Sequence, residues 1–247
     1  MSGHSHYATI KRQKETKDSV RGNLFSKLAK AITIATKAGG GPDPASNFKL
    51  RMVMDAARAA NMPKENIERA ISKASGPETL EEVTYEGYGP SGVAVVVEAA
   101  TDNRNRTGQE IKNIFERGGG SLAGPGAVSF NFESKGLLLI EKGPDPQSQM
   151  LSLIDLGVED VEETVDAIEA YVIPDKLAEL RQKLTEAGFN VTSLELYLKP
   201  KTLQPVSGPA EAKKVLTFLD NLEAQEDVQK VNANVDIPDD IVAQTNV

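Results

Sequence analysis

The spacing of the apolar residues changes at about residue 77, and this change constrains the fold more than any other feature of the chain. Before it, apolar residues recur every three or four positions, the spacing of one face of an α-helix. After it, short β-branched runs alternate with further stretches at helical spacing. This order predicts an α+β protein whose N-terminal part is helical.

The helical part is predicted to be a three-helix domain over residues 22–76. Its first helix covers 22–38, and two more fall within 46–75. Ser46 or Asn47 can cap the second helix, because both side chains accept hydrogen bonds from free N–H groups. Gly76 and the proline after it then end the third helix.

Charge divides the chain at the same place. Residues 1–76 carry fourteen Lys and Arg against six Asp and Glu, whereas the remainder carries fourteen against thirty. The chain as a whole has a net charge of −8. Such asymmetry indicates an anionic partner for the basic end. Residues 1–21 are too polar to form a core, so we expect a basic mobile arm there.

The acidic remainder is predicted to form two domains. Residues 77–83 are expected to be a linker, and residues 83–133 together with 201–247 to form one discontinuous α/β domain. Residues 134–200 are then an inserted domain, in which strands and helices follow the order of a ferredoxin-like split β-α-β fold.

The discontinuous domain should hold three strands, two helices and one glycine-rich turn. Thr107 is expected to cap the first of these helices. The predicted segments are a strand at Val93–Val97, a helix at Gly108–Arg117, a turn at 118–126, a strand at Ala127–Phe132, a helix at Ala210–Leu222 and a strand at Val228–Val235.

Composition argues against an enzyme. The chain has no cysteine and only two histidines, His4 and His6, so we expect no metal site, no cofactor and no catalytic triad. The acidic runs Glu159–Glu163 and Glu223–Asp227 are interpreted as solvated faces. Without an apolar run of membrane-spanning length or a secretory signal, the expected location is the cytoplasm.

Residues 101–107, TDNRNRT, are the second candidate for nucleic-acid contact. They lie where a strand gives way to a helix, so free helix N–H groups point there. Asn103, Arg104 and Arg106 offer groups that suit phosphates or base edges. The alternative is that the Asn residues only build turns and the Arg residues hold the acidic inserted domain.

Together with the basic end, these residues define the predicted interface. The arm and the first helix would track a phosphate backbone, although a solvated basic face is the simpler alternative for the helix. The candidate nucleic-acid-binding residues are His6, Tyr7, Lys11, Arg12, Lys14, Lys17, Arg21, Lys27, Lys30, Asn103, Arg104 and Arg106.

Several long motifs in fixed order resemble the YebC/PmpR family, densely over residues 3–136 and loosely afterwards. They are GHSHYATIK at 3–11, RG at 21–22, GGGPDP at 39–44, NMPKENIERAI at 61–71, YEGYGPSG at 85–92, TDNRNRT at 101–107 and GGGSLAGPGAVSFNF at 118–132. Tyr7 departs from the tryptophan usual in the family, but it keeps an aromatic ring for stacking.

The resemblance implies three domains and a non-enzymatic role in gene expression. The family is customarily described as DNA-binding transcriptional regulators. The family also includes a mitochondrial translational activator of cytochrome oxidase, and one line within it acts on the ribosome and helps translation through difficult sequences such as proline runs. We therefore predict a nucleic-acid-binding regulator. The alternatives are a ribosome-associated factor that binds ribosomal RNA and an acidic protein-interaction adaptor.

Overall fold

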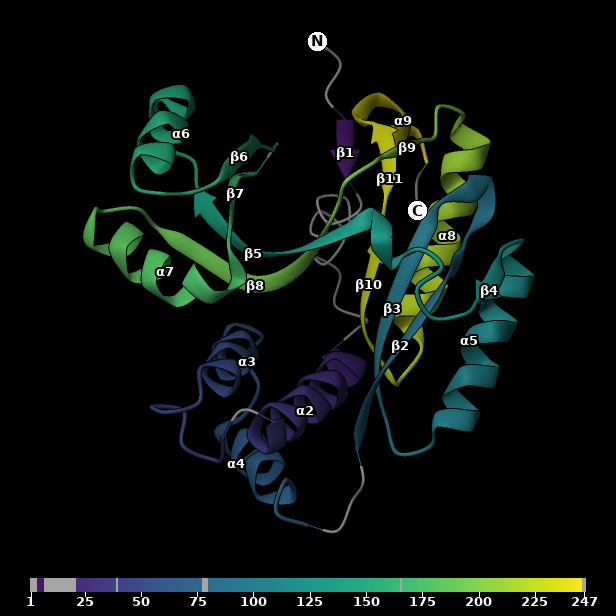
Figure 1. Cartoon of the computed structure of the whole chain (residues 1–247), viewed down its shortest axis with the longest axis horizontal. Helices are drawn as coiled ribbons and strands as arrows, with labels where there is room; N and C mark the ends of the chain where they lie inside the picture. The colour runs from purple at the N-terminus through teal and green to yellow at the C-terminus, as the bar shows by residue number, and fades with distance from the viewer. Residues whose placement is uncertain (1–3, 7–20, 39, 77–79, 165, 246–247) are drawn as a thin grey trace. The chain divides into compact units, whose positions relative to one another are not determined.

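The computed structural model describes residues 4–6, 21–38, 40–76, 80–164 and 166–245 (Figure 1). The chain contains both helices and strands, and its N-terminal part is mainly helical, which confirms the predicted α+β class. The chain forms two compact units. The larger unit comprises Met1–Asn131 and Pro200–Val247, and the smaller unit comprises Phe132–Lys199. The finer division into three domains stays a prediction.

The larger unit begins with a cluster of three helices. These are α2 (Arg21–Ala38), α3 (Phe48–Ala59) and α4 (Lys64–Lys73). Their apolar faces meet in one core, in which Ile32 and Leu50 are fully buried. The side chain of Asn47 accepts a hydrogen bond of 2.9 Å from the N–H of Leu50, which confirms the predicted cap of α3.

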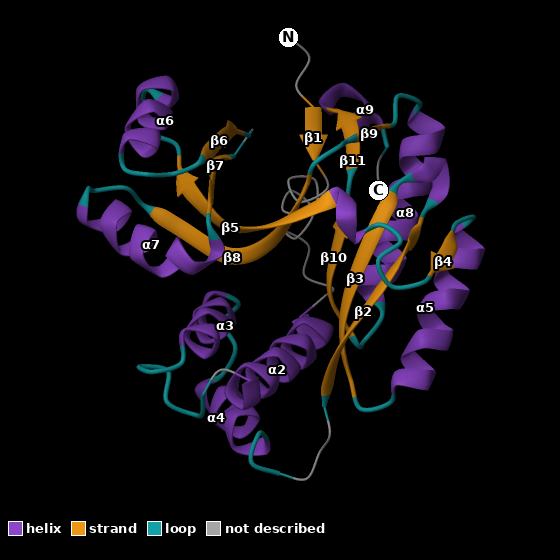
Figure 2. Ribbon diagram, viewed as in Figure 1, coloured by secondary structure: helices purple, strands orange, loops and turns teal. Residues whose placement is uncertain are grey.

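A four-stranded sheet with the order β10-β3-β2-β4 forms the centre of the larger unit (Figure 2). The strands are β2 (Glu81–Tyr88), β3 (Ala94–Thr101), β4 (Ser121–Ala123) and β10 (Val228–Ala233). Neighbouring strands pair antiparallel, and β10 brings the C-terminal part of the chain against β3. One face packs on α5 (Arg104–Gly118) and α8 (Pro209–Ala224), where the rings of Phe115 and Phe218 meet edge to face at 5.1 Å.

A small second sheet holds the start of the chain. Its order is β1-β11-β9, formed by β1 (His4–His6), β11 (Val235–Pro238) and β9 (Gln204–Pro205), and α9 (Asp239–Gln244) follows it. His4 pairs with Pro238 and His6 with Asp236 in antiparallel register. Within the predicted mobile arm, the backbone of residues 4–6 therefore adds a strand to β11. Residues 7–20 of the predicted arm lie outside the described residues.

The smaller unit has the element order β-α-β-β-α-β. Its elements are β5 (Phe132–Glu141), α6 (Pro146–Asp155), β6 (Asp160–Glu163), β7 (Ala167–Val172), α7 (Leu177–Glu186) and β8 (Val191–Pro200). The sheet order is β6-β7-β5-β8, and the two helices pack against it. Fully buried leucines and isoleucines, including Leu138 and Ile168, form the core.

Several local predictions were wrong. The predicted linker overlaps β2, which begins at Glu81. The predicted strand over 127–132 is instead a loop ending in the 3₁₀ turn η3 (Ser129–Asn131), and β5 starts at Phe132. Asn103, and not Thr107, caps α5, because α5 begins four residues earlier than predicted. Two other 3₁₀ turns are η2 (Pro90–Gly92) and η4 (Pro174–Lys176).

An ion-pair network lies in the smaller unit, where the sequence suggested a solvated acidic face. The ammonium of Lys199 lies 2.7 Å from both the Asp160 and the Glu162 carboxylates and 3.7 Å from the centre of the Tyr171 ring. Burial by itself would lower the pKa of Lys199, but its hydrogen bonds to the two carboxylates outweigh burial and raise it. The acidic run is thus partly neutralised within its own sheet.

Candidate nucleic-acid interface

The turn between β3 and α5 presents two of the predicted residues in different ways. The side chain of Asn103 accepts a hydrogen bond of 3.1 Å from the N–H of Arg106, so this amide is engaged in capping α5. The backbone carbonyl of Arg104 accepts a hydrogen bond of 3.1 Å from the hydroxyl of Tyr85. Arg104 itself is exposed. It therefore presents a guanidinium to solvent beside the helix start, where an anion is favoured.

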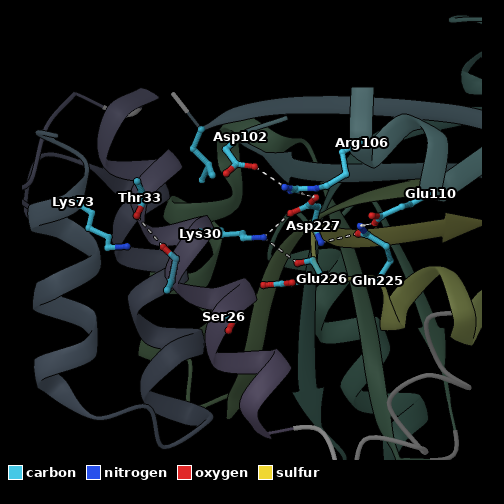
Figure 3. Close-up of a pocket in the computed structure, with 12 residues that line it drawn as sticks. Ser26, Lys30, Thr33, Lys73, Asp102, Arg106, Glu110, Gln225, Glu226 and Asp227 are labelled. Carbon is cyan, nitrogen blue, oxygen red and sulfur yellow. Dashed lines mark hydrogen bonds and ion pairs between the residues drawn. The ribbon is translucent and has the colours of Figure 1, made fainter. Parts of the chain in front are cut away.

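Arg106 points instead into a cluster centred on Asp227 (Figure 3). Its guanidinium lies 2.9 Å from one oxygen of Asp227 and 3.0 Å from the carboxylate of Asp102. The hydroxyl of Thr107 donates to the same Asp227 oxygen at 2.6 Å. Lys30, on α2, donates to the other oxygen at 2.6 Å. One buried carboxylate thus joins α2, α5 and the turn before β10.

Electrostatics in this cluster favour the charged forms of its members. Burial alone would raise the pKa of Asp227, but hydrogen bonds from Lys30, Thr107 and Arg106 outweigh it and hold that pKa well below the usual value. The hydrogen bond to Asp227 raises the pKa of Arg106. Asp227 is therefore ionised at neutral pH. It is also only 3% exposed, so the prediction of a solvated acidic face over Glu223–Asp227 is wrong for this residue.

The basic side of α2 faces the same region of the larger unit. The ammonium of Lys27 donates to the backbone carbonyl of Glu223, and that of Lys30 also donates to the carbonyl of Glu226 at 3.3 Å. The amide of Asn23 donates to the carbonyl of Ala224 at 3.1 Å. These lysines therefore bind the C-terminal end of α8 and the turn after it, a favourable place for cations.

A cavity of about 890 Å³ opens beside Asp227 (Figure 3). Both cations and carboxylates line this cavity, so its electrostatic potential is not of a single sign. Its lining residues are Ser26, Ala29, Lys30, Thr33, Lys73, Leu80, Asp102, Arg106, Glu110, Gln225, Glu226 and Asp227.

Helices α3 and α4 carry a second set of cations, and these side chains are exposed. Arg51 lies 5.6 Å from the Phe48 ring, while the Arg58 and Lys64 side chains form exposed ion pairs with carboxylates on their own helices. Exposed pairs of this kind are weak and can open towards another anion. The exposed cations are Arg51, Arg58, Lys64, Arg69 and Lys73.

The remaining predicted residues belong to the basic N-terminal stretch. For His6 and Arg21 the structure describes the backbone only, in β1 and at the start of α2. The others fall outside the described residues; they are Tyr7, Lys11, Arg12, Lys14 and Lys17. Of the predicted residues, the structure thus brings Lys30 and Arg106 together and leaves Arg104 separately exposed.

Two further observations bear on the expected class of protein. Within the described ranges, His, Asp and Glu side chains form no group of three or more suited to a metal ion. Among the described helices, none is both long and apolar enough to span a membrane.

The comparisons with known proteins agree across the chain. Residues 5–77 match the family described as "TACO1/YebC protein N-terminal domain", and residues 80–235 match "TACO1/YebC second and third domain". A protein of Dictyoglomus turgidum named "Probable transcriptional regulatory protein" is 48% identical, over 98% of both chains. One from Roseiflexus castenholzii with the same name is 46% identical, over 99% of this chain and 98% of its own.

A solved structure shares the fold. The crystal structure of a conserved hypothetical protein from Aquifex aeolicus superposes with a TM-score of 0.86 at 42% sequence identity, covering 95% of this chain and 98% of that one. The relatives' names describe regulators and not enzymes. From the two domain matches and these full-length relatives, the chain belongs to the TACO1/YebC family.

Proposed function

We propose that this chain is a non-enzymatic regulator of gene expression that acts by binding nucleic acid. The observation that carries the proposal is the separation of charge, with fourteen basic against six acidic residues in positions 1–76 of a chain whose net charge is −8. The relatives named as transcriptional regulators support a regulatory role.

The residues of the proposed interface fall into two groups, according to whether their side chains already bind other groups of the chain. The basic stretch, with His6, Tyr7, Lys11, Arg12, Lys14, Lys17 and Arg21, supplies the main phosphate contacts, and exposed Arg104 adds one more. Lys27, Lys30, Asn103 and Arg106 already bind groups of the chain itself. They must exchange those partners for phosphates before they can bind nucleic acid, so their contribution to the affinity is smaller.

Backbone recognition is the mode that these side chains favour. Lys and Arg contacts to phosphates position a protein on nucleic acid without reading its sequence. Such binding releases counterions, so the affinity falls with salt, with a logarithmic slope of about −0.9 per phosphate contact on duplex DNA and about −0.7 on single strands.

A salt titration tests this proposal. Changing Lys11, Arg12 and Lys14 together to alanine should flatten the salt slope by about two to three units on duplex DNA or ribosomal RNA, because three phosphate contacts are lost. The matched control changes three exposed lysines elsewhere, Lys112, Lys176 and Lys213, and should leave the slope unchanged. Equal slopes for both triple variants on both nucleic acids would contradict the proposal and favour the acidic adaptor.

A further inference from the structure

The loop of residues 124–131 in the larger unit presents an aromatic ring to solvent. Phe130, in η3, is 69% exposed. A single exposed apolar side chain is common on protein surfaces, so exposure alone indicates nothing. What sets Phe130 apart is the number of polar groups that fix the backbone around it.

A buried carboxylate holds one side of this loop. Glu86, on β2, accepts hydrogen bonds from the N–H groups of Gly126 at 2.8 Å, Val128 at 2.9 Å and Ser129 at 2.8 Å. Burial would raise the pKa of Glu86, but these hydrogen bonds outweigh it and lower the pKa, so the carboxylate stays charged. The Phe130 backbone is thus held directly after three anchored N–H groups.

Lys201 holds the other side. Its N–H donates to the carbonyl of Asn131 at 2.8 Å, and its ammonium donates to the carbonyl of Phe130 at 3.0 Å. The Asn131 amide in turn donates to the carbonyl of Thr202 at 3.2 Å. An ammonium has three N–H groups, so exposed Lys201 keeps donors for a second acceptor beside the ring.

The local charge is unusual for this acidic part of the chain. Residues 118–132 contain no Asp or Glu, and the nearby charge of Glu86 is directed onto backbone N–H groups. An anion that approaches Lys201 therefore meets no carboxylate from the loop itself. A second ring contacts this loop from β2, since the hydroxyl of partly exposed Tyr88 donates to the carbonyl of Ala127 at 3.2 Å.

We propose that Phe130 and Lys201 form a binding site for an unpaired nucleotide, whose base stacks on the Phe130 ring and whose phosphate contacts the Lys201 ammonium. An exposed ring on a fixed backbone, next to a cation, is a combination by which proteins bind single strands. A duplex keeps its bases stacked on one another and cannot offer a free face. This inference rests on the proposed function and adds a site outside the basic stretch.

The absence of tryptophan from the chain gives a direct probe. The variant Phe130→Trp carries the sole indole, which a stacked base quenches. Unpaired RNA or DNA oligonucleotides should quench its fluorescence. Comparing the quenching by RNA with the quenching by DNA distinguishes the two sources of the nucleotide. A duplex of the same sequence should not quench it. The matched control is Leu151→Trp on α6, a position that is 70% exposed in the smaller unit and should remain unquenched.

Affinity measurements complete the test. Phe130→Ala should weaken single-strand binding by about 5- to 100-fold, whereas Phe130→Tyr should retain it. Lys201→Ala should reduce the single-strand salt slope by about 0.7. Thermal unfolding of the Phe130 variants should stay close to that of the unchanged protein, which separates lost binding from lost folding.

The outcomes separate this inference from the proposed function. If labelled single strands bind the unchanged protein and Phe130→Trp is not quenched, the site is refuted while nucleic-acid binding stands. If no nucleic acid binds, both fail. A blue shift with nuclease-treated cell extract, without quenching by oligonucleotides, overturns the inference and assigns the ring to a protein partner.

Discussion

Glu86 and Asp227 are both buried carboxylates of the larger unit, yet they are stabilised by different kinds of partner. Glu86 is held by three backbone N–H groups of one loop. Asp227 is held by side chains, with Lys30 and Thr107 at 2.6 Å and Arg106 at 2.9 Å. In both cases these hydrogen bonds outweigh burial and lower the pKa.

The difference lies in what each partner can do if the carboxylate is lost. The side chains of Lys30 and Arg106 are 21% and 47% exposed, so they can turn towards water. The N–H groups beside Glu86 belong to the backbone, and Val128 is fully buried. Only the hydrogen bond from Val128 is fully buried, so this N–H group cannot find water unless the loop opens. Glu86 therefore fixes a loop, whereas Asp227 joins elements through partners that can exchange.

The largest predicted effect is that of Glu86→Ala. Removing this carboxylate leaves three N–H groups without their acceptor, and the buried N–H group of Val128 is expensive to leave unsatisfied. We expect the free energy of unfolding to fall by about 3–5 kcal/mol. Urea denaturation followed by circular dichroism measures the change.

The control lies on the same face of the same strand. Glu82 is exposed, and its ion pair with Lys49 at 3.0 Å is also exposed. Glu82→Ala should therefore cost less than about 1 kcal/mol. Similar losses for the two variants would mean that the three hydrogen bonds to Glu86 stabilise no more than a surface ion pair.

A smaller effect is predicted for Asp227→Asn, and it should depend on pH. At pH 7 we expect a loss of about 1–3 kcal/mol, reduced because the cations can rehydrate. The pKa of Asp227 is lowered in the folded state, so its stabilisation is present above the unfolded value of about 3.9 and is lost as the pH falls through the folded pKa.

The stability difference between Asp227→Asn and the unchanged protein should therefore shrink below about pH 4. Urea melts at a series of pH values measure this difference. If the stability difference stays constant down to the lowest pH measured, the charge of Asp227 does not contribute to stability and only the shape of its side chain does.

The fold was predictable wherever apolar residues revealed the buried face. The three N-terminal helices and the strand in the Val93–Val97 run follow from such residues. Strand β2 was missed because one of its core positions is Gly87. A Cβ there would lie 2.6 Å from the Phe115 ring and from the carbonyl of Ser121. Close packing thus requires glycine where a β-branched residue would have revealed the strand.

In the Asp227 cluster, the sequence singled out Lys30 and Arg106 but not the contacts that they make. Arg106 could be selected from its position at a helix start, yet its partner Asp227 lies 121 residues away. Asp227 also ends an acidic run, and such a run resembles a solvated surface. A topology that returns the C-terminal strand β10 to β3 is needed before the two can be placed together.

The smallest predicted effect is the response of the two carboxylates to salt. The Asp227 cluster consists of ion pairs in which Arg106 is 47% exposed, so mobile ions can screen part of the attraction. Between about 0.1 M and about 1 M NaCl, the cost of Asp227→Asn should fall by about 0.5 kcal/mol. The cost of Glu86→Ala should change less, because its partners are backbone dipoles and not exposed charges. The measurement is urea unfolding of both variants at each salt concentration, since guanidinium would itself screen charge. Equal salt responses would contradict the distinction between exchangeable side-chain partners and fixed backbone partners.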